Sequence, residues 1–118
     1  MTLSHKNMND FDKRQLILML QTINNYKSDK VGISRVINNI GGLLNVLEDF
    51  DLNWKEKVRS YWFDLEIEYS VALSKGITNF DTESQNTIRN AIEEIAKLVE
   101  SKLKLYNDAE FDDIEAQK

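Results

Sequence analysis

The sequence predicts an all-α protein, folded as a single-domain antiparallel four-helix bundle. The chain of 118 residues has no proline and only four glycines, so few residues interrupt helix formation. Apolar residues recur at steps of three and four in four separate segments, and no strand-like alternation is sustained. The connections between these segments are short, which favours antiparallel packing of consecutive helices.

The first helix is expected from Asn9 or Asp10, either of which can cap it, to Ser28. Its buried stripe comprises Leu16, Met19, Leu20 and Ile23. Further apolar side chains widen this stripe around the helix: Phe11, Ile17, Leu18 and Tyr26. A helix that is apolar on so much of its circumference is either central in the bundle or carries an interface.

The second helix is expected over residues 33–49, with two consecutive glycines, Gly41 and Gly42, in its middle. Its buried stripe comprises Ile33, Val36, Ile37, Ile40, Leu43, Leu44 and Leu47. Each glycine costs about 1 kcal/mol relative to alanine in a helix interior. The pair either lets another helix approach closely or breaks the segment in two. We favour close approach, because the apolar period continues in phase across the glycines.

The third helix, over residues 53–75, carries both tryptophans of the protein. One face of it comprises Trp54, Val58, Trp62, Leu65, Tyr69 and Leu73. Asn53 is a suitable N-terminal cap, and Gly76 is suited to the left-handed conformation that ends many helices. Tyr61 and Phe63 flank Trp62 and cannot both face the same way as it, so at least one of them is expected to be partly exposed.

The fourth helix is expected over residues 82–106, capped by Asp81 or Thr82, and Thr82 with Gln85 resembles a capping box. Its buried stripe comprises Ile88, Ile92, Ile95, Val99, Leu103 and Tyr106. Glu93 and Lys97 are spaced to pair on its exposed face. The expected organisation is a flexible N-terminus at 1–8, a helical domain at 9–106 and an acidic tail at 107–118.

The net charge of −5 is concentrated in that tail. Residues 1–106 contain 15 acidic and 14 basic side chains, and residues 107–118 contain five acidic side chains against one lysine. No basic stripe is present that could hold a phosphate backbone, so we expect no direct nucleic-acid binding. The charge imbalance favours a basic protein partner.

Several kinds of site are disfavoured by the residues present. The chain has no cysteine, and its single histidine, His5, lies in the expected flexible segment, so nucleophilic and imidazole catalysis are disfavoured. An EF-hand loop starting at Asp49 would need glycine and glutamate at positions that hold Trp54 and Ser60. We therefore expect no metal, no cofactor and no enzymatic activity.

The N-terminus has no apolar segment typical of a signal peptide, and the longest apolar run, Leu16 to Leu20, is too short to span a membrane. We expect a cytoplasmic protein with no membrane association.

The candidate partner-binding residues are acidic or aromatic: Glu48, Asp49, Asp51, Tyr61, Asp64 and Glu68. Asp64 and Glu68 are like charges one helical turn apart, so they are either a solvated pair or a pair that a basic partner relieves of mutual repulsion. Glu66 borders the buried stripe and needs a donor such as a tyrosine hydroxyl or an indole N–H. We favour a half-buried hydrogen-bond network for Glu66 over a binding role.

Two segments together resemble a known class of proteins. These are Ile37-Asn-Asn-Ile40-Gly-Gly-Leu43-Leu44-Asn-Val-Leu47 and the pattern of Trp54 followed by Trp62-Phe-Asp-Leu65-Glu66-Ile-Glu-Tyr69-Ser-Val-Ala72-Leu73. The chain resembles small helical immunity proteins of bacterial contact-dependent growth inhibition and other polymorphic toxin systems. The resemblance covers roughly residues 33–100. It implies tight binding to a cognate toxin domain, often a nuclease with a basic cleft, and it transfers no binding residues.

Two other functions remain open from the sequence. The chain could be a self-associating adaptor or regulatory protein that forms a homodimer through its apolar first helix, by way of Ile17 and Leu18. It could also be an enzyme that uses paired carboxylates with a divalent metal.

Overall fold

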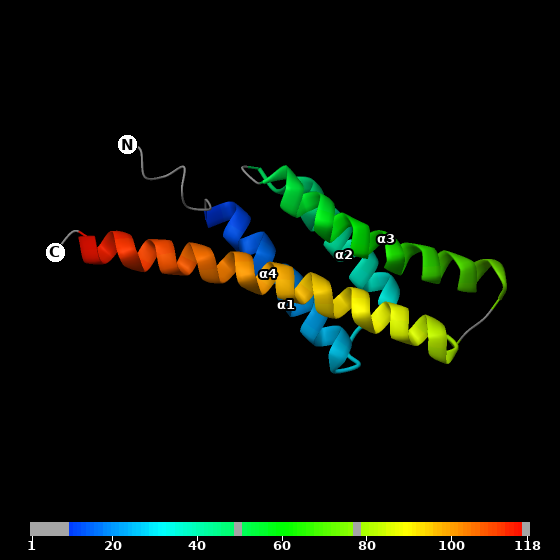
Figure 1. Ribbon diagram of the computed structural model, residues 1–118. Coiled ribbons are helices and arrows are strands. Elements are labelled where there is room, and N and C mark those ends of the chain that lie inside the picture. Colours follow the sequence, from blue (N-terminus) through cyan, green and yellow to red (C-terminus); the bar gives the residue numbers. More distant parts are fainter. Residues whose placement is uncertain (1–9, 49–50, 77–78, 117–118) are drawn as a thin grey trace.

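The computed structural model confirms an all-α, single-domain, four-helix bundle (Figure 1). Its helices are α1 (Asp10–Lys27), α2 (Ile33–Val46), α3 (Leu52–Ser74) and α4 (Thr82–Ala116). The structure describes residues 10–48, 51–76 and 79–116, with the backbone alone from residue 106 onwards. Consecutive helices pack against each other, and α1 also packs against α4, which closes the ring.

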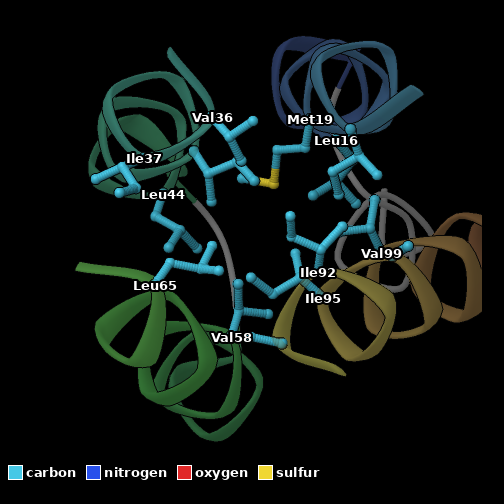
Figure 2. Close-up of a cluster of buried hydrophobic side chains, with 14 of the residues drawn as sticks. Leu16, Met19, Val36, Ile37, Leu44, Val58, Leu65, Ile92, Ile95 and Val99 are labelled. Atoms are coloured by element: carbon cyan, nitrogen blue, oxygen red, sulfur yellow. The ribbon is translucent and has the colours of Figure 1, made fainter. Parts of the chain in front are cut away.

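The core is formed by side chains from all four helices, which meet along the centre of the bundle (Figure 2). The largest of its fully buried side chains are Leu16, Met19, Ile23, Val36, Ile40, Leu44, Val58, Leu65, Ile92, Ile95 and Val99. All of these belong to the apolar stripes expected from the sequence. The 3.6-residue period of each segment therefore identified the inward side of its helix.

The glycine pair does not break α2, and the first of the two, Gly41, permits a close approach by α3. The indole N–H of Trp62 donates a hydrogen bond of 2.8 Å to the backbone carbonyl of Ile37. Gly41 lies one turn after Ile37, where a side chain would lean back over that carbonyl. A Cβ atom at Gly41 would lie 3.0 Å from Cζ2 of Trp62, so any other residue here would require the ring to shift by a few tenths of an ångström.

The second tryptophan of α3 connects this helix to α4. The indole N–H of Trp54 donates a hydrogen bond of 3.1 Å to the carbonyl of Leu98. Trp54 and Trp62 thus attach α3 to two neighbours, α4 and α2, through hydrogen bonds. These bonds are directional, so they define the position of α3 more closely than apolar packing alone. The backbone carbonyls can accept these bonds because each has two lone pairs.

The predicted inward face of α3 is wrong at its last residue. Leu73 is 61% exposed, and Ala72 is buried in its place. The cause is the unequal length of the helices, since α3 has 23 residues and α2 has 14. Trp62 already contacts Ile37, near the start of α2, and α3 runs antiparallel to α2, so the later turns of α3 on that side extend beyond the first residue of α2, Ile33. Only α4 remains to bury the final turn.

Two helix starts differ in detail from the prediction. Asp51, not Asn53, caps α3, and its carboxylate accepts the backbone N–H of Asn53 at 2.9 Å. Of the two caps predicted for α4, Asp81 and Thr82, the structure shows Asp81. Its carboxylate accepts the backbone N–H of Ser84 at 2.7 Å. The amide of Gln85 donates to the carbonyl of Phe80 rather than completing a capping box.

The helix ends are partly as predicted. Gly76 has the left-handed φ of 67° expected after the end of α3. α4 continues to Ala116, beyond the predicted end at Tyr106, because no proline or glycine interrupts this stretch. On the surface of α4, Lys97 pairs with Glu94 at 3.3 Å rather than with Glu93.

One buried carboxylate was not recognised from the sequence. Asp12 is completely buried near the start of α1, and its Oδ1 accepts the backbone N–H of Glu48 at 2.9 Å. It lies four residues before Leu16 and seven before Met19, so it belongs to the inward side of α1. This bond joins the beginning of α1 to Glu48, which lies two residues beyond the C-terminal end of α2.

The two glycines predict opposite effects of the same substitution. Gly41→Ala should lower the free energy of unfolding by about 1 kcal/mol, because the new methyl group crowds an indole that its hydrogen bond holds in place. Gly42→Ala, which meets nothing within 4 Å, should raise it by up to about 1 kcal/mol through helix propensity. Urea denaturation of both variants measures this difference. Equal stabilisation by the two substitutions would contradict the close approach at Gly41.

The cap of α4 predicts a specific pH dependence. The hydrogen bonds from Ser84 hold the pKa of Asp81 below its ordinary value. Stability from this carboxylate is therefore fully present above the unfolded-state pKa, about 3.9, and is lost as the pH falls through the lower folded-state pKa. Asn is an equally good cap that does not titrate. Asp81→Asn should reduce the acid-induced loss of stability, measured by chemical denaturation at pH values from about 2 to about 6. An unchanged profile would contradict this assignment.

Candidate functional site

The candidate contact residues fall into two groups that the fold does not bring together. Glu48 and Asp51 lie at the connection between α2 and α3, while Tyr61, Asp64 and Glu68 lie further along α3. Asp49 is outside the described residues. Asp51 and Asp64 are thirteen positions apart, which corresponds to about 20 Å along a helix axis. A single compact contact surface therefore does not include both groups.

The group at the α2–α3 connection has a structural role. The Asp51 carboxylate is engaged in capping α3, and the Glu48 backbone is held by Asp12. The side chains of Glu48 and Asp51 are both exposed. Within residues 10–48, 51–76 and 79–105, no cluster of three or more acidic or histidine side chains is arranged to hold a metal ion.

The group on α3 lies on a strongly acidic stretch. Residues 60–74 contain three carboxylates and no lysine or arginine. Asp64 is exposed and Glu68 is half-buried, and their spacing places them on the same side of the helix. Glu66 lies on the other flank and is half-buried. Like charges at this spacing repel each other slightly, so the stretch is electrostatically unfavourable until a cation approaches.

An exposed apolar row runs along the same helix and was missed from the sequence. Phe63, Ile67 and Val71 are 52%, 50% and 44% exposed, and each lies one turn after the previous one. This i, i+4, i+8 spacing was the available signal. The row lies on the side of α3 opposite the buried Val58 and Leu65, beside the Asp64 and Glu68 carboxylates. We call Phe63, Asp64, Ile67, Glu68 and Val71 the outward face of α3.

The aromatic residues beside Trp62 divide between core and surface. Tyr61, the aromatic member of the candidate partner-binding residues, is half-buried and packs against the core. Phe63 is exposed, which confirms that at least one of the two faces outward. Its ring meets that of Trp62 edge to face, with 6.3 Å between centroids and an interplanar angle of 71°. Phe63 is thus the aromatic side chain that a partner could reach on this helix.

Glu66 does not form the network favoured from the sequence. The indole N–H of Trp62, one possible donor, is directed to Ile37, and no hydrogen bond to the Glu66 carboxylate occurs in the described part of the chain. Glu66 instead lines a shallow hollow of about 320 Å³ between α2 and α3, together with Trp62, Gly41 and Gly42. Its carboxylate is therefore available at the edge of the outward face.

A larger hollow of about 780 Å³ lies between the end of α1 and the start of α4. Apolar side chains of Ile88 and Ile92 contribute to its lining. Burial raises the pKa of the Tyr26 phenol at its side, and the nearby Asp29 carboxylate adds to this shift. Its charged residues are of both signs: Lys27, Asp29, Arg89 and Glu93. This mixture selects no particular ligand charge, unlike the outward face of α3.

A second exposed apolar feature lies on α1. Ile17 and Leu18, which widened the predicted stripe of this helix, are 39% and 43% exposed. Leu18 also lines a hollow of about 310 Å³ with Leu43 of α2. Ile17 and Leu18 are adjacent in sequence. Unlike the apolar row of α3, they are not accompanied by a row of carboxylates.

Comparisons with protein families, curated proteins and solved structures find no match for this chain. Within the described residues, no helix is long and apolar enough to cross a membrane. The geometry of the outward face of α3 is accordingly the principal guide to function.

Proposed function

We propose that this protein is an immunity protein that binds a cognate bacterial toxin domain and neutralises it in a stoichiometric complex, without catalysis of its own. The observation that supports this most directly is the outward face of α3, where three exposed apolar side chains adjoin two carboxylates. Contiguous exposed apolar residues bordered by charge are typical of protein-binding surfaces. The sequence resemblance to toxin-immunity proteins gives the class of partner.

The two kinds of side chain would contribute differently to such a complex. Burial of Phe63 and Ile67 would supply affinity, since aromatic and aliphatic anchors provide most of the binding energy at interfaces. Asp64 and Glu68 would attract a basic toxin surface, which raises the association rate and disfavours acidic competitors. A nuclease domain, with its basic substrate cleft, is the kind of toxin that these charges suit.

A pull-down from the native bacterium, with the tagged protein as bait, tests the proposed function. Recovery of the C-terminal domain of a large secreted protein at one-to-one stoichiometry, followed by loss of its toxicity on mixing, would support it. Recovery of a toxin domain whose activity is unchanged by the bait would contradict it.

Charge reversal tests the role of the acidic pair. Asp64→Lys with Glu68→Lys should slow association with the toxin at least about tenfold at low salt, and the difference should shrink as salt is added. Glu83→Lys with Glu100→Lys is the matched control, because it makes the same net change on exposed positions of α4. Surface plasmon resonance measures both association rates. Equal slowing by the two double variants would assign the effect to net charge alone.

The alternative function is that of a self-associating adaptor, and the exposure of Ile17 and Leu18 on α1 favours it. In that case the mass measured by sedimentation should rise with protein concentration towards that of a dimer. Ile17→Ser with Leu18→Ser should then restore the monomer without loss of helicity. A constant monomeric mass up to high micromolar concentration would exclude a stable homodimer.

A further inference from the structure

We infer that the outward face of α3 binds an amphipathic, basic α-helix of the partner, laid along α3 so that two helices pack side by side. This inference rests on the proposed function in so far as the partner is the cognate toxin. It specifies what part of that partner is recognised: a surface helix with one apolar stripe flanked by lysine or arginine, rather than the interior of a substrate cleft.

The shape of the apolar row points to a helix. Phe63, Ile67 and Val71 follow one another at i, i+4 and i+8, and therefore form a ridge about 12 Å long on a convex cylinder. A ridge of this kind fits the groove between rows of side chains on another helix, which is the commonest way in which helices pack. An extended peptide, in contrast, would need an exposed sheet edge or a deep groove to satisfy its backbone.

The charges beside the ridge specify the sign of the partner. Asp64 and Glu68 each directly follow a member of the ridge in sequence, so they form a second row along one side of it. No basic side chain occurs between Arg59 and Lys75 to neutralise them. Lysine or arginine residues bordering the apolar stripe of a docked helix would face this row. Exposed pairs of this kind add little affinity each but fix orientation.

The polar atoms at both ends of the ridge are already satisfied. The hydroxyl of Ser60 donates to the carbonyl of Lys57 at 2.8 Å, and that of Ser74 donates to the carbonyl of Val71 at 2.9 Å. Burial beneath a partner helix would therefore not strand these hydroxyl groups without hydrogen bonds. Small side chains at these positions also leave the neighbouring helix free to approach.

The helix that carries the ridge is held in place before any partner arrives. Trp54 and Trp62 attach its inward side to α4 and α2 through hydrogen bonds to backbone carbonyls. A rigid recognition helix loses little conformational freedom on binding, which favours affinity. Trp62 also contacts Phe63 edge to face, so its fluorescence reports on docking over the ridge.

A synthetic peptide tests the inference without knowledge of the partner. The probe is an amphipathic helix of leucine and lysine, and the controls are a scrambled peptide of the same composition and an analogue with glutamate in place of lysine. We expect only the probe to bind and to change the tryptophan emission. Equal binding of the probe and the scrambled peptide would overturn the inference, because charge alone would then explain the interaction.

Variants of the protein locate the binding. The triple variant Phe63→Ser, Ile67→Ser, Val71→Ser should weaken binding of the probe at least about 30-fold, the effect of losing one strong interface anchor. Leu73→Ser is the matched control, because this leucine of the same helix is 61% exposed but lies off the ridge. Circular dichroism checks that both variants remain folded. Probe affinity that the triple variant leaves unchanged would overturn the inference.

The same variants separate this inference from the proposed function. Once a toxin has been recovered, full toxin binding by the triple variant would overturn helix docking at this face and leave the immunity function standing. A recovered partner that is not a toxin, but whose binding the triple variant abolishes, would overturn the immunity function and leave the helix-docking surface standing.

Discussion

The position of α3 depends on the close approach of the Trp62 indole to the backbone of α2. The absence of a side chain at Gly41 leaves the ring its present place beside the Ile37 carbonyl, because a Cβ atom at position 41 would lie 3.0 Å from the ring. The local cost of this glycine in the helix, about 1 kcal/mol, is offset by a partly buried hydrogen bond and by ring contacts that a side chain at position 41 would crowd. A hydrogen bond also has a direction, so it fixes the register of α3 against α2 more narrowly than apolar packing does.

The bond from Trp54 to Leu98 complements this contact on the other flank of α3. With both flanks fixed, the rotation of α3 about its own axis is determined, and so is the set of residues that it presents outward. The ridge of Phe63, Ile67 and Val71 is therefore a consequence of the two tryptophans as much as of its own sequence. A slip of α3 by one residue would rotate it by about 100° and bring this ridge to the flank of the bundle.

Helical periodicity was sufficient to predict the core but not the ends or the surface. The stripes that contain Leu16, Ile40 and Ile95 are buried as expected, because burial follows the 3.6-residue period wherever a neighbouring helix is present. Leu73 is exposed because α3 extends beyond the first residue of the antiparallel α2, and relative helix length cannot be read from the period of one segment. The Phe63 ridge was not predicted from the sequence, because the tryptophan stripe on the opposite side of the same segment has the stronger apolar period. Asp12 was overlooked because a carboxylate in a first helical turn is ordinarily solvated.

The division of α3 into an inner and an outer side separates folding from recognition along one helix. The outward positions take no part in either tryptophan hydrogen bond and lie outside the buried core cluster, so the surface chemistry can change without reconstruction of the fold. A lineage built on this scaffold could exchange one partner for another by altering a handful of codons within a single short stretch of its gene. Binding specificity could then change during evolution while the residues that form the bundle core are conserved.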